Sequence, residues 1–157
     1  MKYYLLPIFL ITFTFKVIAE DVPNQILGKW VCESFEGIIS KEVMFLVDLS
    51  IKYNSDGTSV QTETWRLKGQ EKNIWFTLDL IGTWQLEGST LTEKLIEERL
   101  TSISNYEKMP DIKVMKDIVK SLNLKTKTTV SRVLETSKTK LTTQNFKNEK
   151  VTSCSIG

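Results

Sequence analysis

The chain of 157 residues contains no histidine and only two cysteines, Cys32 and Cys154. The missing imidazole excludes Ser-His and Cys-His catalytic groups, histidine-containing zinc sites and the commonest general base near neutral pH. If the two cysteines pair, no thiol remains as a nucleophile or metal ligand. No glycine-rich phosphate-binding loop is present either. The sequence therefore predicts a protein that is not an enzyme and needs no metal ion or cofactor.

Carboxylates are densest at Glu93, Glu97 and Glu98. Glu93 and Glu97 share one face of a regular strand, because side chains alternate between the two faces. Such a pair serves a hydrolase only when both carboxylates are positioned and desolvated. The mixed charges around them are more typical of an exposed strand, which is the interpretation we favour.

Long apolar runs are missing except at the N-terminus, where Tyr3 to Phe15 is too short for a transmembrane span of ~20 residues. Val17 and Ala19 follow at the positions that signal peptidase reads before a cut at Glu20. We expect residues 1–19 to be a cleaved signal peptide and residues 20–157 to be one domain. That domain would be periplasmic or secreted, without stable membrane insertion. An uncleaved anchor is the alternative.

Excess charge of one sign is also missing once the signal peptide is removed. Residues 1–19 contain Lys2, Lys16 and no acid, so the 21 basic residues fall to 19 and balance the 19 acidic ones. This balance gives no support for nucleic-acid binding. Basic residues are concentrated late in the chain. Either the fold brings them to the acidic first part, or the lysines between 113 and 127 form a basic docking patch.

Alternation of apolar and polar residues predicts β-strands along most of the chain. The clearest strand is Val43–Tyr53, and the turn residues Asn54 to Gly57 predict a hairpin with Thr58–Lys68. The alternation of the returning strand is imperfect at Thr64–Trp65, which indicates a bulge.

The longest alternating run extends from Ile74 to Leu86. Gly82 inside this run indicates a bend or the close approach of another segment. The other strands are expected at Ile26–Phe35, Thr90–Ser102, Lys125–Thr136, Lys140–Phe146 and Glu149–Ile156.

One segment has the periodicity of a helix. Pro110 suits a first helical position, and Asp111 adds negative charge to the first turn. Apolar residues then recur at helical spacing as far as Leu122, with lysines opposite. We expect an amphipathic helix at about 110–122 that packs on the sheet. A helix lying on a membrane surface is the alternative.

Eight antiparallel strands with short turns favour an all-β, up-and-down barrel, with a two-sheet sandwich as the competing arrangement. The first and last strands of such a meander are neighbours only if the sheet closes. Cys32 lies in the first strand and Cys154 in the last, and free thiols are uncommon after export. We therefore predict a Cys32–Cys154 disulfide across the closure of the barrel.

The segment from Ile26 to Trp30 places a Gly-x-Trp sequence at the start of the first strand. It resembles the signature of lipocalins and their calycin relatives. The stretches Tyr53–Thr58 and Gly82–Leu91 are similar to segments of bacterial lipocalin-like domains. The resemblance implies an eight-stranded barrel in which Gly28 and Trp30 form the closed end and Trp30 has a structural role.

The resemblance also implies that a basic residue packs over this tryptophan, and Arg132 is the candidate. The helix departs from the family pattern. In lipocalins a helix usually follows the eighth strand, whereas here it is expected before the last three.

Six apolar residues of one parity in the two clearest strands are expected to face the barrel interior: Phe45, Val47, Leu49, Phe76, Leu78 and Trp84. If they line a cavity, the protein binds a small apolar or amphipathic molecule, as the resemblance also implies. If they fill the interior, it does not.

Trp65 and Trp75 break the parity of their strands, so one of them is expected at the surface and available to a partner. An exported inhibitor or immunity-type protein, which blocks an enzyme through a surface contact, is therefore the alternative function. A self-associating structural component of the cell envelope is a third hypothesis.

Overall fold

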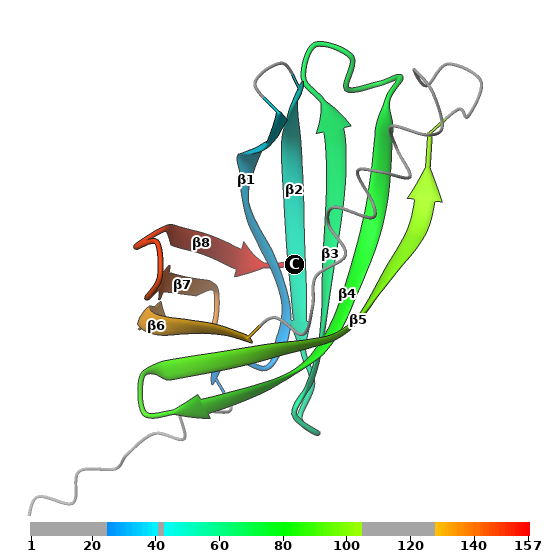
Figure 1. Ribbon diagram of the computed structural model, residues 1–157. Helices are drawn as coiled ribbons and strands as arrows, with labels where there is room; N and C mark the ends of the chain where they lie inside the picture. Colours follow the sequence, from blue (N-terminus) through cyan, green and yellow to red (C-terminus); the bar gives the residue numbers. More distant parts are fainter. Residues whose placement is uncertain (1–24, 41–42, 105–127) are drawn as a thin grey trace, which may run out of the picture.

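Eight antiparallel strands form one sheet that closes on itself in the computed structural model, which describes residues 25–40, 43–104 and 128–157 (Figure 1). Each strand pairs with the next along the chain, and the last pairs with the first. The prediction of an all-β, up-and-down barrel is confirmed, and the sandwich is excluded. The strands are β1 (Gly28–Ser40), β2 (Val43–Tyr53), β3 (Thr58–Leu67), β4 (Trp75–Glu87), β5 (Thr90–Ile103), β6 (Thr128–Thr136), β7 (Lys140–Asn145) and β8 (Val151–Ile156).

Two predicted segments lie outside the described residues: the signal peptide at 1–19 and the helix at 110–122. In the part of the chain that is described, no helix has the length and apolar character needed to cross a membrane.

The hairpin of β2 and β3 forms where its turn residues predict it. Gly57 has a φ of 80°, and its amide donates to the Asn54 carbonyl at 3.1 Å. The prediction of a bulge at Thr64–Trp65 is wrong, since β3 pairs with both neighbouring strands without a shift in register. The alternation is imperfect for another reason: the inner face of β3 carries polar side chains.

A register shift does occur between β4 and β5, next to Gly82. A Cβ atom on Gly82 would lie 2.5 Å from the Lys94 carbonyl oxygen. The close approach of another segment, which the sequence predicts at this glycine, is therefore confirmed.

Three short strands close the barrel over only part of its height (Figure 1). β8 pairs with β1 from Trp30 to Cys32, and β6 pairs with β5 from Thr90 to Lys94. Among the described residues, the later parts of β1 and β5 pair only with β2 and β4. The five long strands therefore rise as a curved sheet beyond the short ones.

Buried apolar residues form two separate groups inside the barrel. The first, here called the Trp30 cluster, consists of Ile26, Trp30, Cys32, Leu49, Ile51, Tyr53, Leu91, Val133, Leu141 and Cys154. The second, the Phe76 cluster, consists of Phe45, Val47, Trp65, Ile74, Phe76 and Leu78. Phe35 packs against both groups and so connects them.

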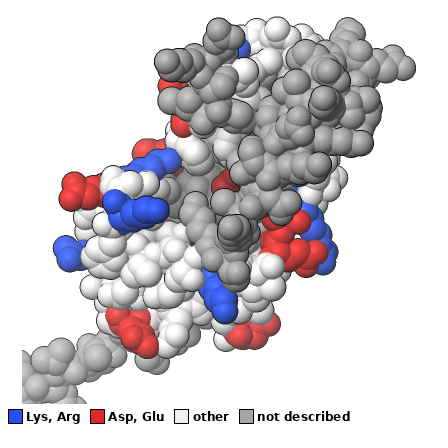
Figure 2. All heavy atoms as spheres, in the orientation of Figure 1, with Lys and Arg blue, Asp and Glu red and all other residues white. Residues whose placement is uncertain are grey.

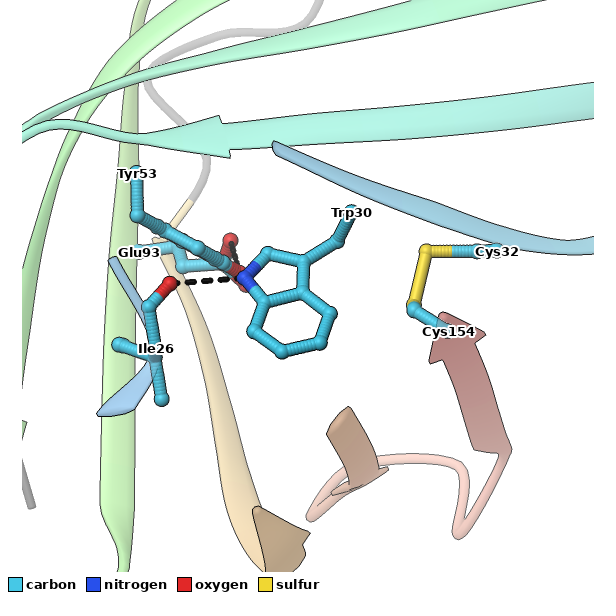
Figure 3. The surroundings of a disulfide bond; sticks show 6 residues. All are labelled: Ile26, Trp30, Cys32, Tyr53, Glu93 and Cys154. Carbon is cyan, nitrogen blue, oxygen red and sulfur yellow. Dashed lines mark hydrogen bonds between the residues drawn. A yellow bond between two sulfur atoms is a disulfide. The ribbon is translucent and has the colours of Figure 1, made fainter. Parts of the chain in front are cut away.

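The predicted disulfide between Cys32 and Cys154 is confirmed and joins β1 to β8 (Figure 3). Beside it Trp30 is 1% exposed, and its indole N–H donates to the Ile26 carbonyl at 2.8 Å. Gly28, two residues earlier, has a φ of 117°, a conformation that favours glycine.

Arg132 does not pack over Trp30, so that expectation is wrong. It is exposed and lies over the Phe146 ring, 5.4 Å from the centroid. Its neighbours Ser131 and Val133 are buried, which leaves the outer face of β6 to Arg132 because strand side chains alternate.

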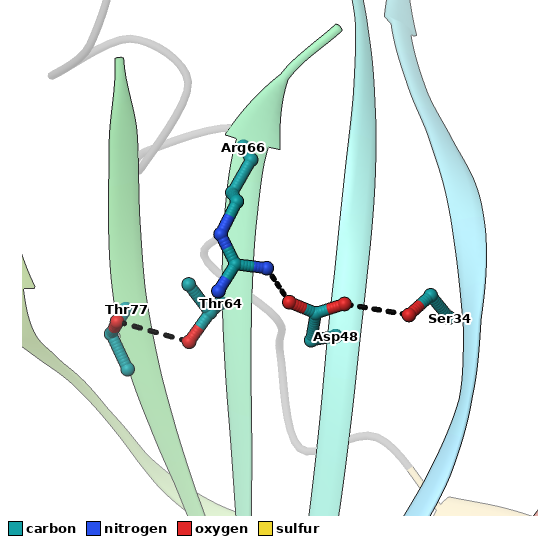
Figure 4. A network of polar contacts seen from close by, with 5 residues as sticks. All are labelled: Ser34, Asp48, Thr64, Arg66 and Thr77. Carbon is teal, nitrogen blue, oxygen red and sulfur yellow. Dashed lines mark hydrogen bonds and ion pairs between the residues drawn. The ribbon is translucent and has the colours of Figure 1, made fainter. Parts of the chain in front are cut away.

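The outer surface of β1 to β4 carries a polar network (Figure 4). Asp48 accepts a 2.6 Å hydrogen bond from the Ser34 hydroxyl and forms an ion pair with Arg66. The hydroxyls of Thr64 and Thr77 are 3.2 Å apart on the neighbouring strands.

Basic and acidic side chains are interspersed among the described residues on the face shown in Figure 2, without an extended patch of one sign. Whether the fold brings the acidic and basic parts of the chain together stays a prediction. The lysines between 113 and 127 lie outside the described residues, so the alternative of a basic docking patch stays a prediction.

Candidate functional site

A cavity of about 400 Å³ lies between the two apolar clusters. Its apolar wall comes from both clusters and from two further residues of β4 and β5, and it includes Phe35, Leu49, Trp65, Leu78, Leu80 and Leu95. Its polar wall includes Gln61, Glu63, Glu93, Glu98, Asn145 and Lys150. The interior is thus neither fully packed nor purely apolar.

A smaller cavity of about 140 Å³ adjoins the first on the side of the Trp30 cluster. The two share Gln61, Glu93 and Lys150 in their linings. Tyr53 and Ser131 line only the smaller one.

The inner face of β3 supplies one polar wall. The register between β2 and β3 determines which side chains of β3 face inward. Trp65 pairs with Val47 and Glu63 pairs with Leu49, and both β2 residues point into the barrel. Glu63 is held through both oxygens, since Gln61 Nε2 donates to Oε1 at 2.6 Å and Trp65 Nε1 donates to Oε2 at 2.9 Å. Two strand neighbours therefore fix this carboxylate at the cavity wall.

A second polar wall comes from β5, and the register shift near Gly82 decides which carboxylates it presents. Glu93 and Glu98 line the cavity, whereas Glu97 is exposed and accepts two hydrogen bonds from Arg99, at 2.6 and 2.9 Å. The expectation that Glu93 and Glu97 share a face is wrong, because the extra residue in β5 reverses the parity beyond it. The prediction that these carboxylates lie on an exposed strand is confirmed for Glu97 and wrong for Glu93.

Glu93 accepts a 2.9 Å hydrogen bond from the Tyr53 hydroxyl (Figure 3). Desolvation by burial raises the pKa of Glu93, and the hydrogen bond from Tyr53 opposes that rise. Desolvation, followed by the charge of Glu93, raises the pKa of Tyr53 well above its ordinary value. The pair therefore places one proton donor and one carboxylate at the boundary between the cavity and the Trp30 cluster.

Lys150 brings an ammonium group to the same cavity. It follows Glu149, which has a φ of 57° in the turn between β7 and β8. The backbone carbonyl of Lys150 accepts a hydrogen bond from the Asn145 amide at 2.9 Å. The Lys150 ammonium nitrogen is 3.5 Å from the centroid of the Phe35 ring. Desolvation lowers the pKa of Lys150, while the charge of Glu63 raises it.

The six predicted interior residues have different places in the structure. Leu49 and Leu78 line the cavity. Phe45, Val47 and Phe76 are buried in the Phe76 cluster, as their alternation predicts. Whether any of the six contacts a ligand stays a prediction.

Trp84, the sixth, packs against the Trp30 cluster, with its ring centroid 5.4 Å from that of Tyr53. Its indole N–H donates to the Asn54 carbonyl at 3.1 Å.

Of the two tryptophans that break parity, Trp65 is buried and lines the cavity. Its ring stacks on that of Phe76, and the two ring centroids are 5.8 Å apart. Trp75 is half-buried and pairs in register with Arg66. Neither is fully exposed.

The polar lining was missed by reasoning from the sequence, which assigned only apolar residues to the interior. A signal was present. With the register of the β2–β3 hairpin fixed by its turn, the residues opposite Leu49 and Ile51 are Glu63 and Gln61, and they must share the inner face.

No protein-family model matches this chain, and no curated protein matches it. Among the described residues, no group of three or more histidine, cysteine, aspartate or glutamate side chains is arranged to hold a metal ion.

Proposed function

We propose that this chain is an exported, lipocalin-like protein whose barrel binds a small amphipathic molecule. The observation that carries this proposal is the cavity of about 400 Å³ with apolar and polar walls. Its volume falls within the range of about 300–1,000 Å³ that is typical of small-molecule sites.

The lining favours an amphipathic ligand over a purely apolar one. A purely apolar molecule would displace water from the carboxylates of Glu63 and Glu93 without replacing its hydrogen bonds, and such losses cost about 1–3 kcal/mol each. A molecule with one polar end avoids this cost. Its apolar part would contact Leu49, Leu78 and Leu80, and its polar end would face the carboxylates.

The barrel and the disulfide support the other parts of the proposal. An eight-stranded, antiparallel, closed barrel is consistent with a lipocalin-like fold, and Trp30 is buried inside it shortly after Gly28. A disulfide is compatible with a periplasmic or secreted protein.

The alternative, an inhibitor or immunity-type protein, depended on an exposed tryptophan and a lysine-rich helix. Trp75 is half-buried, and the residues of the helix lie outside the described ranges. No observation therefore favours this alternative over ligand binding in the cavity.

Two substitutions on neighbouring positions of β3 test the proposal. Gln61→Phe adds a ring inside the cavity, whereas Val60→Phe adds one on the outer face of the strand. We expect the neutral fluorescent probe N-phenylnaphthylamine to bind the wild-type protein saturably, the Val60→Phe variant equally well, and the Gln61→Phe variant at least about tenfold more weakly. Circular dichroism verifies that both variants are folded. Equal binding by all three proteins, or none by the wild type, would overturn the proposal.

A further inference from the structure

The chain already holds one ammonium group inside its own cavity. Lys150 is exposed along much of its side chain, but its nitrogen is 3.5 Å from the Phe35 ring centroid, and the residue lines both cavities. The face of an aromatic ring attracts a cation through its quadrupole, by about 0.5–2 kcal/mol depending on desolvation. The Phe35 ring thus forms an ammonium-binding subsite in the cavity, and the flexible Lys150 side chain fills it.

The surroundings of this subsite suit a cation better than an anion. Trp65 lies in the same wall and stacks on Phe76, and the indole N–H of Trp65 fixes the carboxylate of Glu63. The cavity lining has three carboxylates, Glu63, Glu93 and Glu98, against two lysines, Lys94 and Lys150. Both lysines are exposed along their side chains, so each of them can turn its ammonium group toward water.

We propose that the cavity selects amphipathic molecules with an amine or quaternary ammonium head, and that this head replaces the Lys150 ammonium on the Phe35 ring, near Glu63. The inference rests on the proposed function and names the class of ligand. Lys150 then acts as an internal competitor that keeps the subsite occupied until a ligand arrives.

Displacement of Lys150 requires little rearrangement. The residue lies at the end of the turn between β7 and β8, where most side chains are exposed, so its ammonium group can move into water by rotation of its own stem. The backbone can stay in place, because hydrogen bonds from Asn145 to the Lys150 carbonyl and from the Lys150 amide to Asn148 hold it.

The opposite assignment, an anionic ligand paired with Lys150, is disfavoured by the same lining. An anion beside Lys150 would also stand in the field of Glu63, whose charge already acts on that lysine. Like charges at short range in a partly desolvated cavity repel strongly.

Three probes with the same octyl chain separate the assignments: octyltrimethylammonium, octyl glucoside and octanoate. We expect the cation to bind the wild-type protein about tenfold more tightly than octanoate, measured by calorimetry or by displacement of N-phenylnaphthylamine. Lys150→Met removes the competing ammonium and keeps an apolar stem, so it should tighten binding of the cation. Glu63→Gln should weaken it. Lys147→Met, in the same turn but outside the cavity linings, is the matched control and should change nothing.

The outcomes distinguish this inference from the proposed function. Tightest binding of octanoate, its loss in the Lys150→Met variant, or equal binding of all three probes would overturn the inference and leave the binding function standing. If neither N-phenylnaphthylamine nor any octyl probe binds, both proposals are wrong.

Discussion

The Tyr53 hydroxyl donates a 2.9 Å hydrogen bond to the Glu93 carboxylate across the interior of the barrel. Tyr53 is 2% exposed and belongs to the Trp30 cluster, whereas Glu93 lines both cavities. The pair therefore marks the place where the apolar packing of the Trp30 cluster changes into the polar wall of the cavity.

Glu93 should make the protein less stable as the pH rises above about 4.5, its ordinary pKa. Because desolvation raises the pKa of Glu93 in the folded state, the folded protein keeps this proton to a higher pH than the unfolded chain. The stabilisation is fully present below the unfolded pKa and is lost as the pH rises through the folded one. In the Glu93→Gln variant this decline should be missing, as measured by urea unfolding from pH 4 to pH 8.

Glu97→Gln is the control for this titration. The hydrogen bond from Arg99 lowers the pKa of the exposed Glu97, so its small contribution has the opposite sign and is lost as the pH falls. If the Glu93→Gln variant shows the same pH dependence as the wild type, the interior position of Glu93 is contradicted.

Tyr53→Phe should destabilise the protein by about 1–3 kcal/mol, because it removes a hydrogen bond to a buried carboxylate and leaves that carboxylate underpaired. In the Glu93→Gln background the same substitution should cost less. A double-mutant cycle from unfolding curves measures the difference, and strict additivity of the two substitutions would show that the side chains do not interact.

Opening the disulfide should cost about 4–5 kcal/mol on the chain-entropy model, because Cys32 and Cys154 are separated by 122 residues. The measurement is the urea midpoint with and without a reductant. The double variant Cys32→Ser, Cys154→Ser should resemble the reduced wild type and should not respond to the reductant. A wild-type midpoint that ignores reduction would contradict the role of the bridge.

Gly82→Ala should destabilise the protein by about 3 kcal/mol, since its Cβ would lie 2.5 Å from the backbone oxygen of Lys94 and the strands would have to separate. Gly88→Ala is the comparison. Gly88 has a φ of 58° and no atom within 4 Å of its added Cβ, so the substitution should cost only about 1 kcal/mol of backbone strain. Equal costs would contradict the close approach of β5 to Gly82.

Much of the fold could be predicted from the sequence because alternation is a local signal. β2 begins and ends where its pattern predicts, and the turn at Gly57 and the pairing of Cys32 with Cys154 follow from residue type. Gly82 also pointed correctly to a close contact.

The cavity wall was harder to predict, because it depends on register between strands. Glu93 and Glu98 share the interior only because β5 has one extra residue opposite Gly82, and nothing in the sequence of β5 alone indicates this. Lys150 reaches the cavity through a left-handed residue, Glu149, which is not glycine. Gln61 and Glu63 were missed because the sequence analysis assumed that inward-facing residues are apolar.

The indole N–H resonance of Trp65 gives the most direct test of ligand binding in the cavity. Its indole lies in the cavity wall and donates to Glu63, whereas Trp75 lies outside the cavity linings and provides the internal reference. On titration with octyltrimethylammonium, we predict a saturable shift of the Trp65 signal in a ¹H–¹⁵N spectrum and little change in that of Trp75. A Trp65 signal that stays in place while the probe is in excess, or that moves no more than Trp75, would contradict the account.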